Sequence, residues 1–127
     1  QGQRAWHRHL DGPHRREAYQ IHYAKGCDIV EKSQDGFDEA VKAARESDVV
    51  VMALGGNCGW VNVTGGEGKD RCTLDLPGVQ QELLETVAQV GKPVIVVLYG
   101  PGVFAVNWAK EHGAGIIQAW MPGPYAG

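Results

Sequence analysis

The stretch Asp48-Val49-Val50-Val51-Met52-Ala53-Leu54 is a short apolar run rich in β-branched residues, which is typical of a strand covered on both faces. The pattern stops at Gly55, and apolar periodicity returns only near the helix that Pro77 opens. A connection of this length inside a compact domain is unusual, and such loops are mostly functional or disordered. The centre of this loop is Thr64-Gly65-Gly66-Glu67-Gly68-Lys69-Asp70-Arg71, and it needs an explanation.

The composition fits one globular domain, since the 127 residues are 43% hydrophobic and 21% charged. No stretch approaches the roughly 20 apolar residues of a membrane span, and the first residues lack the apolar centre of a signal peptide. The net charge of −3 argues against general nucleic-acid binding, which needs a basic face. We therefore expect neither a nucleic acid nor a membrane as partner, and the sequence indicates no particular compartment.

Residues 1–20 are set apart by their basic, histidine-rich composition. The spacing of His7, His9 and His14 matches no ligand motif, so we expect a solvated arm or linker of uncertain origin. The chain has three cysteines and no C-x-x-C pair, which removes the usual zinc and thioredoxin interpretations. Cys58 and Cys72 lie at opposite ends of the loop, where either a disulfide or buried free thiols would fit. We expect no metal site.

The order of the expected elements indicates the fold class. Strands alternate with helices, which predicts an α/β domain: a mostly parallel sheet with helices on both faces, in a flavodoxin-like three-layer sandwich. Asp35 and Asp38 are expected to cap the first helix. Ligands gather at the carboxyl ends of such strands, where the loop with Glu67 begins. The expected strands are 21–24, 48–54, 93–98 and 115–120, and the helices are 36–45, 77–91 and 104–112.

Two further features concern the ends of these elements. The helix from Pro77 has an apolar stripe at helical spacing: Val79, Leu83, Leu84 and Val87. The sequence ends shortly after the strand 115–120, so we expect a truncated domain in which this strand exposes one face unless a further segment covers it.

Two glycine-rich segments resemble nucleotide sites. Gly68-Lys69 resembles the end of a phosphate-binding loop, but Val63 and Asp70 stand where that motif needs Gly and Ser or Thr. The segment 100–105 satisfies G-x-G-x-x-A, but it follows a later strand, and no acidic residue lies about 20 positions further on. A nucleotide-binding α/β domain therefore stays a minor alternative, and we expect no cofactor.

Glu67 stands between two glycines, so its carboxylate can project without steric shielding. A carboxylic acid presented into a cleft is what protonation of a leaving oxygen requires. The alternative is a surface glutamate in a glycine-rich turn. Asp70 and Arg71 fit an ion pair or a loop brace, and Trp60 and Trp120 fit the walls of a cleft, because flat apolar rings stack on sugars. Trp108 fits the core.

The string from Gly66 to Leu84, GEGKDRCTLDLPGVQQELL, resembles the E-G-x-D-R-x-x-L-x-L-P-G-x-Q-x-x-L-L stretch of the C-terminal domain of family 3 glycoside hydrolases, the β-glucosidases and β-xylosidases. Its neighbours are similar to that domain in the same order: 23–27, 44–52, 91–98 and 119–123. The resemblance covers residues 21–127. Departures are the turn 99–102 in place of N-G-R-P, and 124–126 in place of acidic residues and Gly.

The resemblance implies an α/β sandwich domain that packs on a (β/α)8 barrel, which supplies the nucleophile and most sugar contacts. By motif position Glu67 is the general acid/base of a retaining reaction, with Asp70 and Arg71 shaping its loop. The expected substrates are β-linked oligosaccharides or aryl glycosides, and this chain alone is expected to be inactive. An inactive carbohydrate-binding module, using Trp60 and Trp120, is the main alternative.

Overall fold

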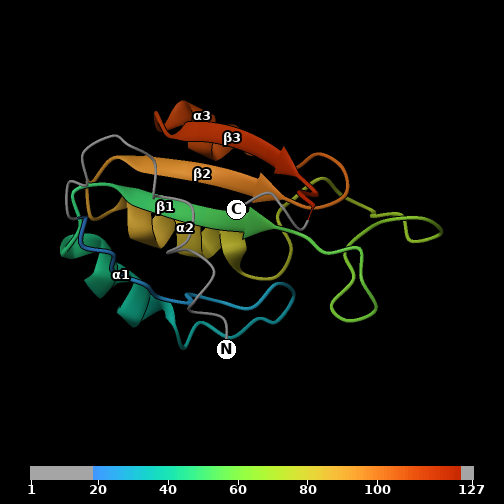
Figure 1. Ribbon diagram of the computed structural model, residues 1–127, viewed down its shortest axis with the longest axis horizontal. Helices are drawn as coiled ribbons and strands as arrows, with labels where there is room; N and C mark the ends of the chain where they lie inside the picture. The colour runs from blue at the N-terminus through green and yellow to red at the C-terminus, as the bar shows by residue number, and fades with distance from the viewer. Residues whose placement is uncertain (1–18, 124–127) are drawn as a thin grey trace.

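Among the described residues, three parallel strands form the sheet. The structure, a computed structural model, describes residues 19–123; the expectations for residues 1–18 and 124–127 lie outside the described residues. The strands β1 (Val50–Gly55), β2 (Val94–Tyr99) and β3 (Gly115–Trp120) lie side by side in chain order (Figure 1). Both pairs are parallel, so a crossover carries the chain back after each of the first two strands. The predicted α/β class and parallel sheet are confirmed.

In the part of the chain that the structure describes, three helices accompany the sheet: α1 (Phe37–Arg45), α2 (Gln80–Ala88) and α3 (Asn107–Glu111). In Figure 1, α2 and α3 lie behind the sheet, and α1 packs against α2. The predicted apolar stripe of the second helix is confirmed, because all four of its residues are buried. They share one core with Met52, Leu54, Val96 and Leu98 of the sheet. None of the described helices is long and apolar enough to span a membrane.

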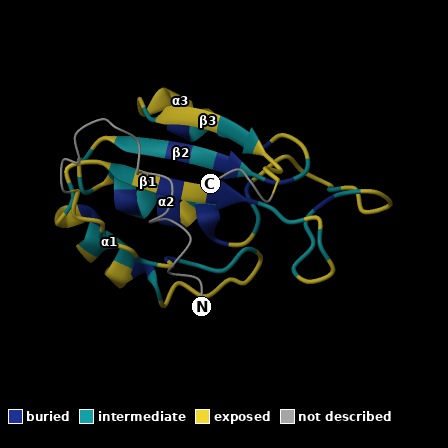
Figure 2. Ribbon diagram, in the orientation of Figure 1, coloured by how far each residue is buried: buried dark blue, intermediate teal, exposed yellow. Residues whose placement is uncertain are grey.

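The other face of the sheet is open within residues 19–123. The register places Ala53 beside Val97 and Ile117, and side chains on this face alternate with the buried ones. Val51 is 64% exposed and Ile117 is 52% exposed. Figure 2 shows exposed stretches in both β1 and β3. As expected, β3 exposes an apolar face. The expectation that the first strand is covered on both faces is not met by the described residues.

The second and third helices begin later than predicted. Gly78 has a φ of 61°, and a Cβ there would lie 3.0 Å from the Ile29 carbonyl oxygen, so the chain turns at Gly78 before α2 starts. α3 starts at Asn107 rather than at residue 104. The Ala105 N–H donates to the Leu74 carbonyl at 2.7 Å, so this segment pairs with the preceding loop instead of forming a helical turn.

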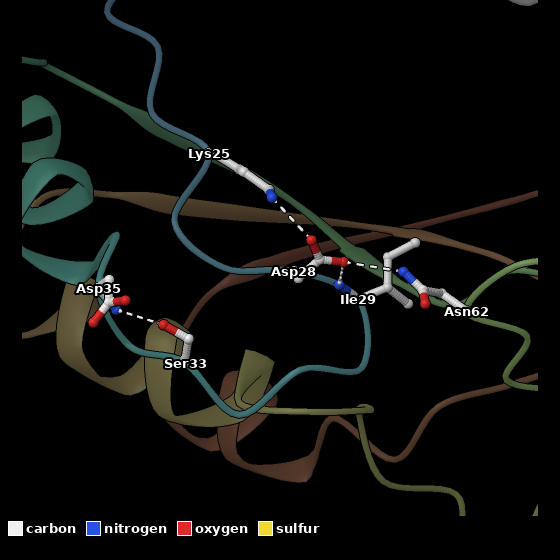
Figure 3. Close-up of polar contacts among 6 residues, drawn as sticks. All are labelled: Lys25, Asp28, Ile29, Ser33, Asp35 and Asn62. Carbon is white, nitrogen blue, oxygen red and sulfur yellow. Dashed lines mark hydrogen bonds and ion pairs between the residues drawn. The ribbon is translucent and has the colours of Figure 1, made fainter.

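Two predictions near the N-terminal end of the described chain are wrong. Residues 21–24 form no strand, although their exposure alternates as in one. Asp35 does not cap α1: the cap position is Gly36, without a side-chain bond. The Phe37 N–H instead donates to the Gln34 carbonyl at 3.0 Å. Upstream, the Ser33 hydroxyl accepts from the Asp35 N–H at 3.2 Å, which forms a local turn (Figure 3).

Candidate active site

Three loops leave the carboxyl ends of the strands at one edge of the sheet (Figure 1): residues 56–79, called the long loop below, 100–106 and 121–123. Two hydrogen bonds continue the ladder past the strands. The Gly56 N–H donates to the Tyr99 carbonyl at 2.9 Å, and the Gly100 N–H donates to the Trp120 carbonyl at 2.8 Å. The loops therefore begin from fixed, adjacent positions, as expected for the binding edge of a parallel sheet.

Asn57 organises the first half of the long loop. Its N–H donates to the Thr64 hydroxyl at 3.0 Å, and its carbonyl accepts from the Thr64 N–H at 2.8 Å. Its side-chain oxygen accepts from the Gly59 N–H at 3.0 Å, and its amide donates to the Val61 carbonyl at 2.8 Å. Residues 57–64 thus form a closed lobe whose shape is set by one asparagine and one threonine.

Glu67 lies in a tight turn of the second half. The Lys69 N–H donates to the Gly66 carbonyl at 3.0 Å, which closes a four-residue turn around Glu67 and Gly68. Gly68, at the third position, has a φ of 67°, a conformation that favours glycine. The Glu67 side chain is exposed, and no hydrogen bond or ion pair within residues 19–123 involves its carboxylate. The turn presents the carboxyl group outward from the loop.

Arg71 braces the long loop against the loop 100–106. Its Nη2 donates to the Val103 carbonyl at 2.6 Å, and its guanidinium carbon lies 4.3 Å from the centroid of the Phe104 ring. Its Nη1 is buried and has no hydrogen-bond partner among the described residues. The segment that matched G-x-G-x-x-A is therefore the docking surface for Arg71.

Asp70, Trp60 and Trp120 are all exposed. Asp70 is exposed, and no ion pair with Arg71 is found within residues 19–123, so Arg71 is a brace without that partner. Trp60, in the lobe of residues 57–64, is 97% exposed, and the Lys69 Nζ lies 5.9 Å from its ring centroid. Trp120, at the end of β3, is 50% exposed. The two rings belong to separate segments, and their part in the wall of a cleft stays a prediction.

Trp108 is partly buried against the core, as predicted, and its ring stacks on His112 with 4.0 Å between the centroids.

Asp28 links the segment before α1, called the N-terminal segment below, to the long loop (Figure 3). One oxygen accepts from the Lys25 ammonium at 2.9 Å, and the other accepts from the Ile29 N–H at 2.8 Å and the Asn62 amide at 3.3 Å. The bond from Lys25, and after it the bond from the Ile29 N–H, lowers the pKa of Asp28. The same pairing raises the pKa of Lys25.

All three cysteines are free in the structure. Cys58 and Cys72 are exposed rather than buried, and Cys27 is partly buried. The Cys58 thiol lies 3.1 Å from the Met121 sulfur, which connects the long loop to the segment after β3. Within residues 19–123, no group of three or more histidine, cysteine or carboxylate side chains is arranged to hold a metal ion.

Gln80 is a residue that the sequence analysis missed. It is 3% exposed, and its Oε1 accepts from the Gly55 N–H at 2.7 Å. Its Nε2 donates to the carbonyls of Gly55 at 2.7 Å and of Ile29 at 3.0 Å. A signal was present, because Gln80 stands at helical spacing from Leu83 and Leu84 and so falls on the buried stripe of α2.

Comparison with known proteins identifies the family of this domain. Residues 3–127 match the glycosyl hydrolase family 3 C-terminal domain, and the match begins inside the segment 1–20. A β-xylosidase of Formosa agariphila is 45% identical over 120 residues, which are 93% of this chain. A β-glucosidase of Bifidobacterium adolescentis superimposes with a TM-score of 0.70 at 36% identity, over 82% of this chain and 15% of that one.

A further structural relative is a β-glucosidase from Listeria innocua, solved in complex with gluconolactone. It has a TM-score of 0.67 at 32% identity, over 80% of this chain and 13% of that one. The chain spans only 16% of the length of the Formosa agariphila relative, so these proteins contain much more than the matched domain. The match to the family extends over nearly all of the 127 residues, and the chain belongs to the glycosyl hydrolase family 3 C-terminal domains.

Proposed function

We propose that this chain serves as the C-terminal domain of a retaining β-glycosidase and contributes Glu67 as its general acid/base. The observation that carries the proposal is the Glu67 turn: an exposed carboxylate, held in a glycine turn at the binding edge of the sheet. The relatives named as β-xylosidase and β-glucosidase support a β-xyloside or β-glucoside as substrate.

In a retaining reaction two carboxyl groups lie about 5 Å apart, one as nucleophile and one as acid/base. The resemblance assigns the nucleophile to a barrel domain outside this chain. Glu67 would first protonate the leaving oxygen and then remove a proton from the attacking water. A carboxylate with no protein partner within residues 19–123 is available for both steps. The Arg71 brace and the Asn57 lobe would hold the turn while it faces the other domain.

The test is Glu67→Gly in the full-length glycosidase, assayed on 2,4-dinitrophenyl and phenyl β-xylosides and β-glucosides, with and without azide. Loss of the acid/base should lower kcat/KM for the phenyl substrate by about 100- to 10,000-fold. The dinitrophenyl group leaves without protonation, so that substrate should still form the glycosyl-enzyme. Azide should then restore its turnover and yield a β-glycosyl azide, because azide attacks without a general base.

Asp75→Asn is a matched control, since Asp75 is an exposed carboxylate of the same long loop outside the Glu67 turn. It should retain activity on both substrates without azide. Normal activity of Glu67→Gly would remove Glu67 from the mechanism and direct the search to other carboxylates.

A carbohydrate-binding module without catalysis is the second candidate function, favoured by the 97% exposure of Trp60. Both proposals expect the 127-residue chain alone not to hydrolyse aryl β-glycosides. They differ in binding: a module should bind xylo- or gluco-oligosaccharides saturably in calorimetry, and Trp60→Ala should abolish that binding. Hydrolysis by the chain alone would contradict both.

A further inference from the structure

Gln80 joins the two ends of the long loop, which are called its neck below. Gly55 is the last residue before the loop, and Gln80 is the first residue after it. Two hydrogen bonds of 2.7 Å join them directly, one to the Gly55 N–H and one to the Gly55 carbonyl. The side chain of one residue therefore connects the two ends of the segment that carries Glu67.

The amide of Gln80 occupies the place of a neighbouring strand. The N–H groups of Val50 and Gly56 donate to the carbonyls of Pro93 and Tyr99, so the even-numbered residues along β1 face β2. Gly55 faces the opposite edge, where the described residues supply no strand. The Gln80 side chain offers one donor and one acceptor there, as a peptide group of a strand would.

Both hydrogens of the Gln80 amide are used. The second donates to the Ile29 carbonyl at 3.0 Å, which ties the N-terminal segment to the same point. The side chain is 3% exposed and Gly55 is buried, so water is a poor substitute for these bonds. A Cβ on Gly55 would collide with the Tyr99 carbonyl, so only glycine fits at this position.

We propose that Gln80 is a positioning residue for the acid/base step: by closing the neck, it fixes where the long loop presents Glu67. This inference rests on the proposed function, because Gln80 acts through Glu67 and touches no substrate itself. Without the amide, α2 and β1 remain packed through their apolar side chains, but the neck loses its polar connection. Glu67 would then sample several positions relative to the leaving oxygen.

The test compares Gln80→Met with Gln81→Met in the full-length glycosidase. Methionine keeps the length and apolar stem of glutamine and removes the amide. Gln81 lies on the same helical turn, is partly buried, and its amide donates only to Glu85. Gln80→Met should lower kcat/KM, which reports formation of the glycosyl-enzyme, by about 10- to 100-fold for phenyl glycosides and by less than about 3-fold for dinitrophenyl glycosides. Gln81→Met should leave both within about 2-fold.

A general loss of stability would lower the activity on both substrates equally, and that result would overturn the inference. The double variant Gln80→Met with Glu67→Gly gives a second criterion. If Gln80 acts through Glu67, the double variant should be no slower than Glu67→Gly alone. If the activity losses of the two single variants multiply in the double variant, the inference is also overturned. If Gln80→Met does not fold, Gln80→Glu keeps an acceptor for the Gly55 N–H, removes both donors, and should show the same difference between substrates.

Hydrogen exchange separates this inference from the proposed function. In the 127-residue chain, Gln80→Met should speed exchange of the Gly55 amide at least about 10-fold, while Gly56, bonded to Tyr99, keeps its protection. If Glu67→Gly has normal activity but Gly55 exchange responds, the assignment of Glu67 fails and Gln80 only closes the neck. If Glu67→Gly is impaired but Gln80→Met shows no difference between substrates, the positioning role alone fails.

Discussion

The two faces of the sheet differ in how far the described chain completes them. On the face toward α2, Val96 is fully buried and Leu98 is 2% exposed. On the opposite face Val51 of β1 is 64% exposed, although it also belongs to an apolar run. β-Branched residues fill both faces, so strand propensity does not distinguish them. The difference arises because the crossovers of a sheet in the order β1-β2-β3 place α2 and α3 on the same side (Figure 1).

The comparison indicates which residues stabilise this chain by themselves. Side chains toward the helices contribute through contacts within residues 19–123. Apolar side chains on the open face contribute only if something outside those residues covers them, since exposed apolar patches otherwise mark interaction surfaces. Relatives of this chain contain much more polypeptide than the matched domain. Substitutions on the open face should therefore change the free energy of unfolding less in this chain than in a longer protein that covers the face.

The largest effect is expected on the helix-covered face. Leu84 of α2 is fully buried in the core, so Leu84→Ala removes several methyl groups and leaves a cavity. We expect the free energy of unfolding of the 127-residue chain to fall by about 2–5 kcal/mol in urea denaturation followed by circular dichroism. Val51→Ala is the matched change on the open face and should cost less than about 1 kcal/mol. Similar losses at both positions would show that the two faces are equally covered.

A polar change on the open face should have a smaller effect on this chain. Val51→Thr and Ile117→Thr keep β-branched side chains and add a hydroxyl, so their strand preference is retained. Each should change the free energy of unfolding of the 127-residue chain by no more than about 1 kcal/mol. In a longer protein in which this face is covered, the same hydroxyls would be buried and should cost about 1–3 kcal/mol. A large loss in the short chain would mean that residues outside 19–123 already cover the face.

The predictable part of the fold is the part that depends on local pattern. The strand 115–120 and the apolar stripe of α2 were predicted correctly, because a run of β-branched residues and a helical spacing are visible over a few residues. The start of α2 was not predicted correctly, since the positive φ of Gly78 and the carbonyls that leave no room for a side chain there belong to the tertiary structure. The prediction of a strand at residues 21–24 was wrong for a similar reason. The alternation of residues 21–24 is present, but pairing depends on a partner edge that is distant in the sequence.

The candidate site shows the same division. The Glu67 turn could be placed from sequence, because a carboxylate between glycines after an apolar strand is a local signal. The brace of Arg71 could not, since its partners Val103 and Phe104 come from another loop. Gln80 lies on the apolar stripe of α2, but its role could not be predicted, since its partners Gly55 and Ile29 are distant in the sequence. The role of Glu67 itself stays a prediction until the azide experiment is done.

The smallest expected effect concerns the reactivity of the cysteines, which differ in burial as the two faces of the sheet do. Cys27 packs against the core, whereas Cys58 and Cys72 are exposed. Burial, and after it the charge of Asp28, raises the pKa of the Cys27 thiol. Thiolate is the reactive form, so iodoacetamide at pH 8 should modify Cys27 most slowly, as followed by mass spectrometry of peptides. A thiol whose pKa is raised by folding favours the folded state below its unfolded pKa of about 8.5, and this contribution is lost as the pH rises through the folded value. Unfolding should therefore become slightly easier above pH 9, and Cys27→Ser should remove that dependence. Equal labelling rates for all three cysteines would show that the covered face opens as readily as the exposed loop.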